Sequence, residues 1–184
     1  MKLEKVIGLS SKGQEAIEVN PVTGDLVYIA GSFLVIYSPQ QSKQTMHLCS
    51  RTSRPFQCCQ FSKDGKYLAA GESAFRQPQI TIWEINYVEV EENNTKVVVV
   101  KPEQIQPQDQ KVYVKRAADY TPIKQLKGHK YGIECVKFSP DAEFLISIGD
   151  PNDRGLFVWD WRAEKKISSN KLSKPALTLA ISDE

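Results

Sequence analysis

The chain has 184 residues, of which 41% are hydrophobic and 25% are charged, close to the average for soluble globular proteins. This length suits one domain with a full hydrophobic core. The net charge is only +2, from 24 basic and 22 acidic residues, so charge alone gives no reason to expect a nucleic-acid partner. No apolar run approaches the roughly 18 residues that a membrane-spanning helix needs, and the opening MKLEKVIGLSSKGQ is too charged for a signal peptide.

The cysteines and the two histidines are too few and too scattered to suggest a metal site. The cysteines are Cys49, Cys58, Cys59 and Cys135, and no two of them form a C-x-x-C pair. Because successive side chains of a strand point to opposite faces, Cys58 and Cys59 are predicted on opposite faces of one strand. We expect buried, reduced thiols in a cytosolic protein, with no metal and no cofactor.

In chain order, three segments repeat one pattern, in which an alternating apolar strand is followed by a polar turn and a second apolar strand. The segments are AIEVNPVTGDLVYIAG (16–31), QCCQFSKDGKYLAAGE (57–72) and IECVKFSPDAEFLISIG (133–149). A third strand follows each of them, as FLVIY (33–37), QITIWEI (79–85) and LFVWDW (156–161). A fourth copy begins with ALTLAISDE (176–184). The repeats predict an all-β architecture built from similar units.

The spacing of the turns supports a repeat and locates an insertion. The turn residues Asn20, Ser62, Ser139 and Ser182 are separated by 42, 77 and 43 residues. The first and third intervals match the roughly 40–45 residues of a four-stranded propeller blade. The middle interval is 34 residues longer than the last, which indicates an insertion at 86–120. Its runs VVVV and KVYVK allow a protruding hairpin, and its polar composition equally allows a disordered insert.

The third copy carries a Gly-His pair at 128–129 and a Trp-Asp pair at 159–160. Ser147 falls on the second strand between them, and Asp153 falls in the turn that follows this strand. A buried imidazole needs partners for both ring nitrogens, and a carboxylate together with a hydroxyl supplies them. We predict a structural, hydrogen-bonded tetrad of His129, Ser147, Asp153 and Trp159.

The first two copies depart from this pattern. The second copy has Trp83 but no Gly-His pair, and Gln77 stands where the aspartate would be. The first copy has Tyr37 in place of the tryptophan. These two units are therefore expected to rely on packing alone.

With its Gly-His and Trp-Asp pairs, the third copy resembles the WD-repeat β-propellers. Further segments narrow the resemblance, namely LEKVIG (3–8), GDLVYIAGSFLVIYSP (24–39), FSKDGKYLAAGES (61–73) and VWDW (158–161). They are similar to the amino-terminal propeller of the family that contains the mitogen-activated-protein-kinase-binding protein and its spindle-pole relative. A more distant resemblance is to the echinoderm microtubule-associated-protein-like family. The resemblance implies a non-enzymatic scaffold.

The predicted fold is an incomplete WD-repeat β-propeller with three blades and the first strand of a fourth. The expected bounds are about 14–49 for blade 1, 56–85 and 121–127 for blade 2 around the insertion, 132–170 for blade 3 and 175–184 for the start of blade 4. Because closure removes exposed strand edges, we expect a larger chain whose remaining blades close the ring. The alternative is a short protein that closes its ring by self-association.

No catalytic residue is predicted, since the chain has no P-loop, G-x-S-x-G or H-E-x-x-H motif. In a propeller, the loops between blades and those between second and third strands emerge on one rim. These loops carry arginines and aromatic residues, which are the usual anchors of protein interfaces. The candidate partner-binding residues are Arg51, Arg54, Phe75, Arg76, Lys130, Tyr131, Arg154 and Lys174, and the acids expected nearby are Glu72, Asp150 and Asp153. The alternative is scattered surface charge.

The predicted function is a protein-interaction scaffold in kinase signalling or in centrosome and spindle assembly, and the alternative is a protein that binds microtubules directly, including in a cilium. The expected partners are other proteins, with acidic peptides, kinases and tubulin as candidates, and the expected location is the cytoplasm and its cytoskeleton. No membrane is expected as a partner. RNA binding through the basic rim is the weaker alternative, because no RNA-stacking motif accompanies the charge.

Overall fold

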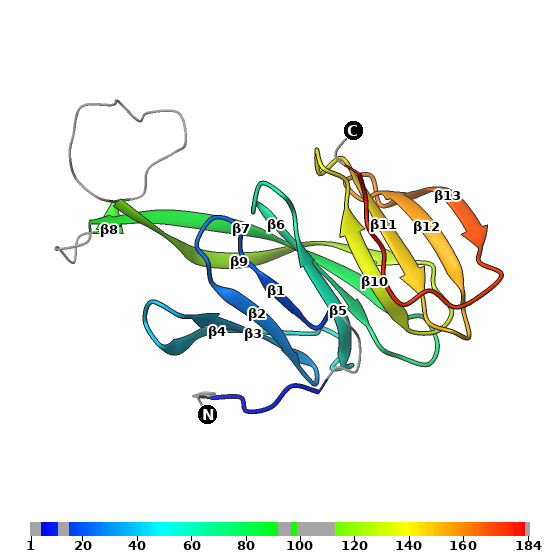
Figure 1. Cartoon of the computed structure of the whole chain (residues 1–184), viewed down its shortest axis with the longest axis horizontal. Helices are drawn as coiled ribbons and strands as arrows, with labels where there is room; N and C mark the ends of the chain where they lie inside the picture. The colour runs from blue at the N-terminus through cyan, green and yellow to red at the C-terminus, as the bar shows by residue number, and fades with distance from the viewer. Residues whose placement is uncertain (1–4, 11–14, 92–96, 99–112, 183–184) are drawn as a thin grey trace.

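The computed structural model describes residues 5–10, 15–91, 97–98 and 113–182. Every regular element in this part of the chain is a β-strand, and neighbouring strands pair antiparallel in three sheets. The sheets follow one another in chain order and pack face to face (Figure 1). Each sheet begins with an innermost strand and proceeds outward, as the blades of a propeller do. The predicted all-β propeller fold is thus confirmed, and the three sheets do not close into a ring within the described residues.

Blade 1 contains β1 (Ile17–Val19), β2 (Leu26–Ala30), β3 (Phe33–Ser38) and β4 (Lys43–Cys49). Blade 2 contains β5 (Phe56–Phe61), β6 (Tyr67–Glu72), β7 (Gln79–Glu91), β8 (Val97–Val98) and β9 (Tyr113–Lys127). Blade 3 contains β10 (Ile133–Phe138), β11 (Phe144–Gly149), β12 (Gly155–Asp160) and β13 (Lys165–Lys171). In blade 2, β7 is the third strand and pairs with β6, β8 and β9.

The turn between the first two strands has the same chemistry in blades 2 and 3. In blade 2 the Ser62 hydroxyl donates to the Asp64 carboxylate at 2.6 Å and accepts from the Tyr67 amide at 2.9 Å. In blade 3 the Ser139 hydroxyl makes the equivalent bonds with Asp141 and the Phe144 amide. Short polar side chains that bond to nearby backbone favour turns, which explains why Ser-x-Asp marks this position in both repeats.

Blade 2 is covered on both faces by its neighbours. Cys59 belongs to the apolar cluster shared with blade 1, whereas Cys58 belongs to the cluster shared with blade 3. The two adjacent cysteines therefore point to opposite faces, as predicted, and both side chains are buried. On β6, Ala69 and Ala70 divide between the same two clusters. This double coverage explains why the strands of blade 2 read as nearly continuous apolar runs.

The described part of the segment where the first strand of a fourth blade was expected, residues 175–182, is not paired as a strand. Residues 175–182 follow β13 but form no strand. They lie beside the innermost strand of blade 3, where the Cys135 thiol donates to the Leu177 carbonyl at 3.4 Å, and Thr178 reaches Glu15 of blade 1. A strand requires a hydrogen-bonded neighbour, and no described strand pairs with this segment, so its alternating apolar pattern alone does not produce one.

The predicted insertion at 86–120 is partly an extension of blade 2. The strands β7 and β9 pair antiparallel from Gln79 opposite Lys127 to Glu91 opposite Tyr113, with register shifts next to Trp83 and Tyr87. We call residues 86–91 and 113–119 the arm, which reaches past the other strands toward the left of Figure 1. Of the described residues of the runs VVVV and KVYVK, Val97–Val98 forms β8 and pairs with β7, and residues 113–115 belong to β9, which also pairs with β7. Residues 92–96 and 99–112 lie outside the described residues.

A half-buried tyrosine, Tyr87, connects the base of the arm with blades 1 and 2. The Tyr87 hydroxyl donates to the Gly65 carbonyl at 2.5 Å and accepts from the Asn20 amide nitrogen at 2.9 Å. Asn20 is only 1% exposed, and its side-chain oxygen accepts from the Val22 amide at 2.8 Å. Burial raises the pKa of Tyr87 to about 12, so the hydroxyl keeps its proton near neutral pH. One side chain thus connects the arm with the turns of two blades.

The substitution Tyr87→Phe should lower the free energy of unfolding by about 1–3 kcal/mol, because it leaves the buried Asn20 amide and the Gly65 carbonyl without this partner. The midpoint of urea unfolding, measured together with the slope, reports the change. The control is Tyr131→Phe, since Tyr131 is half-buried on the opposite rim. Equal midpoints for the two variants would contradict the role assigned to Tyr87.

Candidate functional site: the loop rim

The loop rim is the surface formed by the loops at 50–55, 73–78, 128–132 and 150–154. Each loop either joins two blades or joins the second and third strands of one blade. Antiparallel pairing within the blades brings these loops to the same end of the innermost strands β5 and β10. The residues that the sequence singled out, except Lys174, lie in or beneath these loops.

The four residues of the predicted tetrad form one hydrogen-bonded chain in blade 3. The Trp159 indole N–H donates to the Ser147 hydroxyl at 2.8 Å. Ser147 in turn lies 2.8 Å from His129 Nε2, and His129 Nδ1 bonds the Asp153 carboxylate. His129 is 3% exposed, and Ser147 is fully buried. The chain connects the loop before β10 with β11, β12 and the turn between these two strands.

Two glycines make room for this arrangement. A Cβ atom at Gly128 would lie 2.7 Å from the Trp159 ring, and one at Gly149 would lie 2.6 Å from the Asp153 Cβ. Any larger residue would displace the indole or the carboxylate from the chain. Both residues of the Gly-His pair therefore contribute to the tetrad. Gly128 leaves room for the Trp159 ring, and His129 is connected with the same ring by way of the Ser147 hydroxyl.

The hydrogen bonds around His129 suit a neutral imidazole with its proton on Nδ1. Because the Ser147 hydroxyl accepts from Trp159, its own proton is free to be donated to His129 Nε2. The imidazole proton then resides on Nδ1 and points to Asp153. Burial lowers the pKa of His129, and the Asp153 carboxylate only partly opposes this shift. Near neutral pH the imidazole is therefore uncharged, and both of its nitrogens are bonded inside the blade, which suits a structural role.

Blade 2 has a different polar connection, which the sequence analysis missed. Glu72 is 1% exposed, and its carboxylate accepts from the Ser50 hydroxyl at 2.8 Å and from the Gln79 amide at 3.0 Å. Thr52 donates to the same carboxylate. Glu72 occupies the last position of β6, as Gly149 does on β11. The expectation that blade 2 relies on packing alone was therefore wrong, and Glu72 is not a surface acid of the rim.

Three predicted rim residues line a surface hollow of about 820 Å³ between blades 2 and 3. Its walls are formed by Arg54, Arg76, Gln77, Lys127, Gly128, His129 and Lys130. Arg54 is held in place by its Nη1, which donates to the carbonyls of Arg76 at 2.9 Å and Gln77 at 3.0 Å. Lys127, at the end of β9, joins the cations that the sequence had indicated. We call this surface the basic hollow.

An aromatic pair borders the basic hollow. The rings of Phe75 and Tyr131 meet edge to face with their centroids 5.6 Å apart, and Phe75 is 79% exposed. Tyr131 and Lys130 also line a second hollow of about 510 Å³, toward β12 and β13. An exposed aromatic ring beside a group of cations is typical of protein interfaces.

The other predicted rim residues lie apart from the basic hollow. Arg51 lines a separate hollow of about 190 Å³ with Lys124 and Glu164. Arg154 is half-buried and donates from Nη1 to the Ser173 carbonyl at 3.2 Å, so it holds the segment after β13 in place. Lys174 follows this segment and is exposed. The structure therefore brings together Arg54, Phe75, Arg76, Lys130 and Tyr131, and separates them from Arg51.

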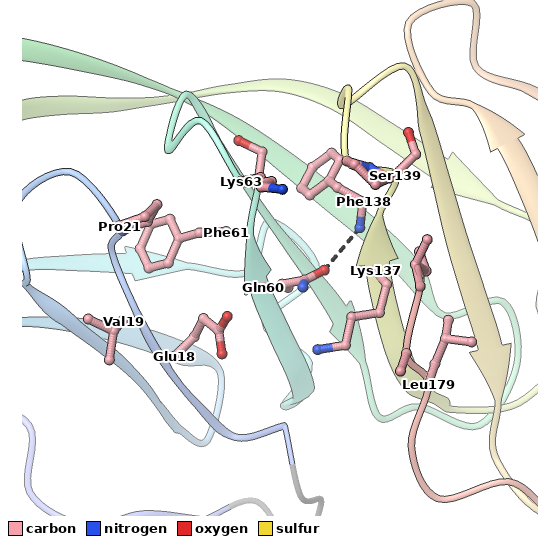
Figure 2. Close-up of a pocket in the computed structure, with 14 residues that line it drawn as sticks. Glu18, Val19, Pro21, Gln60, Phe61, Lys63, Lys137, Phe138, Ser139 and Leu179 are labelled. Atoms are coloured by element: carbon pink, nitrogen blue, oxygen red, sulfur yellow. Dashed lines mark hydrogen bonds between the residues drawn. The ribbon is translucent and has the colours of Figure 1, made fainter. Parts of the chain in front are cut away.

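A further hollow, of about 430 Å³, lies at the opposite ends of the innermost strands (Figure 2). Gln60 and Phe138 connect two of these strands there, since the Phe138 amide donates to the Gln60 side chain at 2.9 Å. Glu18 and Lys137 approach the hollow from different strands. Burial raises the pKa of Glu18, and Lys137 partly opposes the shift. This hollow carries charges of both signs, unlike the basic hollow.

The comparisons with known proteins agree with the geometry of blade 3. A family model described as "WD domain, G-beta repeat" matches residues 120–160, which include the whole tetrad. The chain is a WD-repeat protein. Among the described residues of this WD-repeat chain, no group of three His, Cys, Asp or Glu side chains is placed to hold a metal. No helix in the same residues is long and apolar enough to cross a membrane.

Curated relatives match nearly the whole WD-repeat chain. "WD repeat-containing protein 62" of Mus musculus is 31% identical over 182 residues, which are 99% of this chain and 10% of the relative. "Mitogen-activated protein kinase-binding protein 1" of Mus musculus is 28% identical over 99% of the chain and 10% of the relative. "Centriole proteome protein 16" of Chlamydomonas reinhardtii is 27% identical over 90% of the chain and 8% of the relative. The chain thus spans about a tenth of the length of these relatives.

A solved structure has the same fold. The crystal structure of the RRP9 WD40 repeats superimposes with a TM-score of 0.59 at 17% sequence identity, covering 91% of this chain and 42% of that chain. At this identity the likeness concerns the fold alone. The resemblance to WD-repeat propellers that the sequence predicts is confirmed.

The substitution Ser147→Ala should lower the free energy of unfolding by about 1–3 kcal/mol, because two buried groups, His129 Nε2 and the Trp159 indole N–H, lose their shared partner. Denaturant unfolding followed by tryptophan fluorescence measures this loss. The matched control is Ser168→Ala on β13, whose side chain is exposed. If both variants unfold at the same denaturant concentration, the tetrad contributes nothing to stability.

The lowered pKa of His129 predicts a pH dependence of stability. The unfolded imidazole titrates near pH 6.5, whereas the folded one binds a proton less readily. The free energy of unfolding should therefore fall as the pH is lowered through about 6.5, since the unfolded state binds more protons. Unfolding measured from about pH 8 to about pH 5 should show this fall in the wild type and a weaker one in His129→Asn. Parallel curves would show that His129 does not cause the dependence.

Proposed function

We propose that this WD-repeat chain is part of a non-enzymatic scaffold that binds acidic segments of partner proteins through the loop rim. The observation that carries the proposal is the basic hollow, where Arg54, Arg76, Lys127 and Lys130 line one surface without a carboxylate among the lining residues. Phe75 and Tyr131 supply apolar contact area beside it. Opposite charges across an interface favour association and partner choice.

The proposed setting is kinase signalling or centrosome and spindle assembly. It is supported by relatives whose printed names refer to mitogen-activated protein kinase binding and to the centriole. The chain covers about a tenth of each of those proteins. We therefore carry the kind of partner that their names give over to this chain as a proposal. Kinases and other cytoplasmic proteins are the partners that we propose first.

The absence of enzymatic activity belongs to the same proposal. The two groups most suited to proton transfer or nucleophilic attack in blade 3 are engaged in structure, since His129 bonds Ser147 and Asp153 while Cys135 is buried and bonds a carbonyl. Burial raises the pKa of Cys135 to about 12, which keeps the thiol protonated. A protonated thiol is a poor nucleophile.

The second candidate function is direct binding to microtubules, including those of a cilium. Two observations favour it, namely the basic hollow and the similarity to a centriole protein. Tubulin tails are acidic, so they would meet the same cations. With either function, we propose that further blades close the ring. Exposed apolar side chains on the outer blades support this closure, namely Ile17 and Val19 on β1 and Ile167 on β13.

The proposal is tested with a double charge reversal, Arg76→Glu with Lys130→Glu. Co-precipitation of mitogen-activated protein kinases and co-sedimentation with microtubules, with and without their acidic tails, would be compared at low and high salt. At least one partner should bind about tenfold more weakly to the variant, and its salt dependence should become shallower. The control is Arg51→Glu, a charge reversal outside the basic hollow. Unchanged binding of every captured partner to the double variant would refute a role for this rim.

A further inference from the structure

The basic hollow gathers its cations from separate loops onto one small surface. Arg54 comes from the loop before β5, Arg76 from the loop between β6 and β7, and Lys130 from the loop before β10. Lys127 adds a fourth cation from the end of β9. Arg76, Lys127 and Lys130 are exposed, and Arg54 is half-buried. Four positive charges at one place repel one another unless an anion lies between them.

No carboxylate is among the residues that line the basic hollow, and Asp150 lies in the adjoining loop at 150–154. Two further acids of the neighbouring loops are bonded inside the blades, Glu72 to Ser50 and Asp153 to His129. At the position in blade 2 that corresponds to Asp153, the chain has the neutral Gln77, six residues before Trp83 as Asp153 is six residues before Trp159. The residues that line the basic hollow therefore carry a net positive charge.

The backbone presents Arg54 to the hollow in a fixed orientation. Arg76 and Gln77 both have positive φ, 70° and 54°, a conformation that non-glycine residues rarely adopt. Their carbonyls accept two bonds from Nη1 of Arg54, and these acceptors are neutral. Within the described residues the other guanidinium nitrogens of Arg54 make no hydrogen bond, so they remain available to a ligand at the wall of the hollow. Such a guanidinium can bind two oxygens of one anion at once.

We infer that the basic hollow binds the phosphate of a phosphorylated side chain in a partner protein. This inference rests on the proposed function and names the ligand of the same site. A phosphate group carries a charge of about −1.5 to −2 and three acceptor oxygens, whereas a carboxylate carries one charge and two oxygens. Four converging cations match the phosphate better. The adjoining Phe75–Tyr131 pair supplies a contact for an apolar residue of the same peptide.

The geometry favours a phosphopeptide over a nucleic acid. A nucleic-acid backbone presents phosphates at regular intervals and is usually met by an extended basic groove. Here the cations converge on one hollow, and the neighbouring hollow toward β12 and β13 includes Asp153 among its lining residues. The surface thus suits a single strongly charged group on a chain that is otherwise able to make apolar contacts.

The test uses the protein immobilised at physiological salt and three pools of fluorescent peptides with random flanking residues. The pools have phosphoserine, serine or glutamate at one fixed central position. The phosphoserine pool should be retained at least about tenfold more than either of the other pools. Arg76→Gln and Lys130→Gln should each reduce this preference several-fold, and Arg51→Gln, outside the hollow, should leave it unchanged. Inorganic phosphate and a single-stranded RNA pool serve as competitors.

Several results would overturn the inference. Equal retention of the phosphoserine and glutamate pools, lost in Arg76→Gln, would leave an acidic-peptide rim and remove the phosphate specificity. The inference would also be overturned if no pool is retained while the double charge reversal still weakens the binding of kinases or microtubules. That result would leave the proposed function standing. Displacement by RNA at lower concentration than by phosphopeptide would assign the hollow to nucleic acid. Failure of the proposed function itself appears only in the partner-binding experiment.

Discussion

The structure depends on the burial of blade 2 between its two neighbours. A sheet with apolar side chains on both faces is stable only when both faces are covered, and here the two clusters that include Cys59 and Cys58 provide that cover. This packing also sets the positions of the rim loops. The side chains between the sheets fix the distance between neighbouring strands, and the loops begin and end at those strands. The basic hollow lies at the seam between blades 2 and 3, so its shape follows from the second of these clusters.

Hydrogen bonds beneath the rim, in addition to packing, hold the rim loops in place. In blades 2 and 3 a buried carboxylate connects the loop that enters the blade with the loop between its second and third strands. Blade 3 takes this carboxylate from Asp153 and blade 2 takes it from Glu72. These acids are bonded inside the blades, and no carboxylate is among the residues that line the basic hollow above them.

Much of the fold was predictable from local patterns, and the errors have physical causes. The spacing of the turns predicted the blades. The adjacent residues Cys58 and Cys59 predicted two covered faces, because successive side chains of a strand point to opposite faces whatever its partners are. Glu72 was missed because a glutamate in sequence reads as a surface residue until its donors, Ser50 and Thr52, are brought to it by the fold. Residues 175–182 have the pattern of a strand, but pairing depends on a neighbour that a pattern does not supply. Arg51 lies near Arg54 in sequence, yet its side chain lines a separate hollow.

The crowding at Gly149 restricts how one type of blade could change into the other during evolution. A glutamate at this position, as in blade 2, would enter the space of Asp153 and place two carboxylates together. A blade that first loses the aspartate would instead pass through a form with no buried carboxylate and with loops held less firmly. The two arrangements therefore exclude each other, and a single substitution does not lead from one to the other without a less stable intermediate. Blades 2 and 3 have similar strand patterns, but they hold their loops with different buried carboxylates that one blade cannot combine.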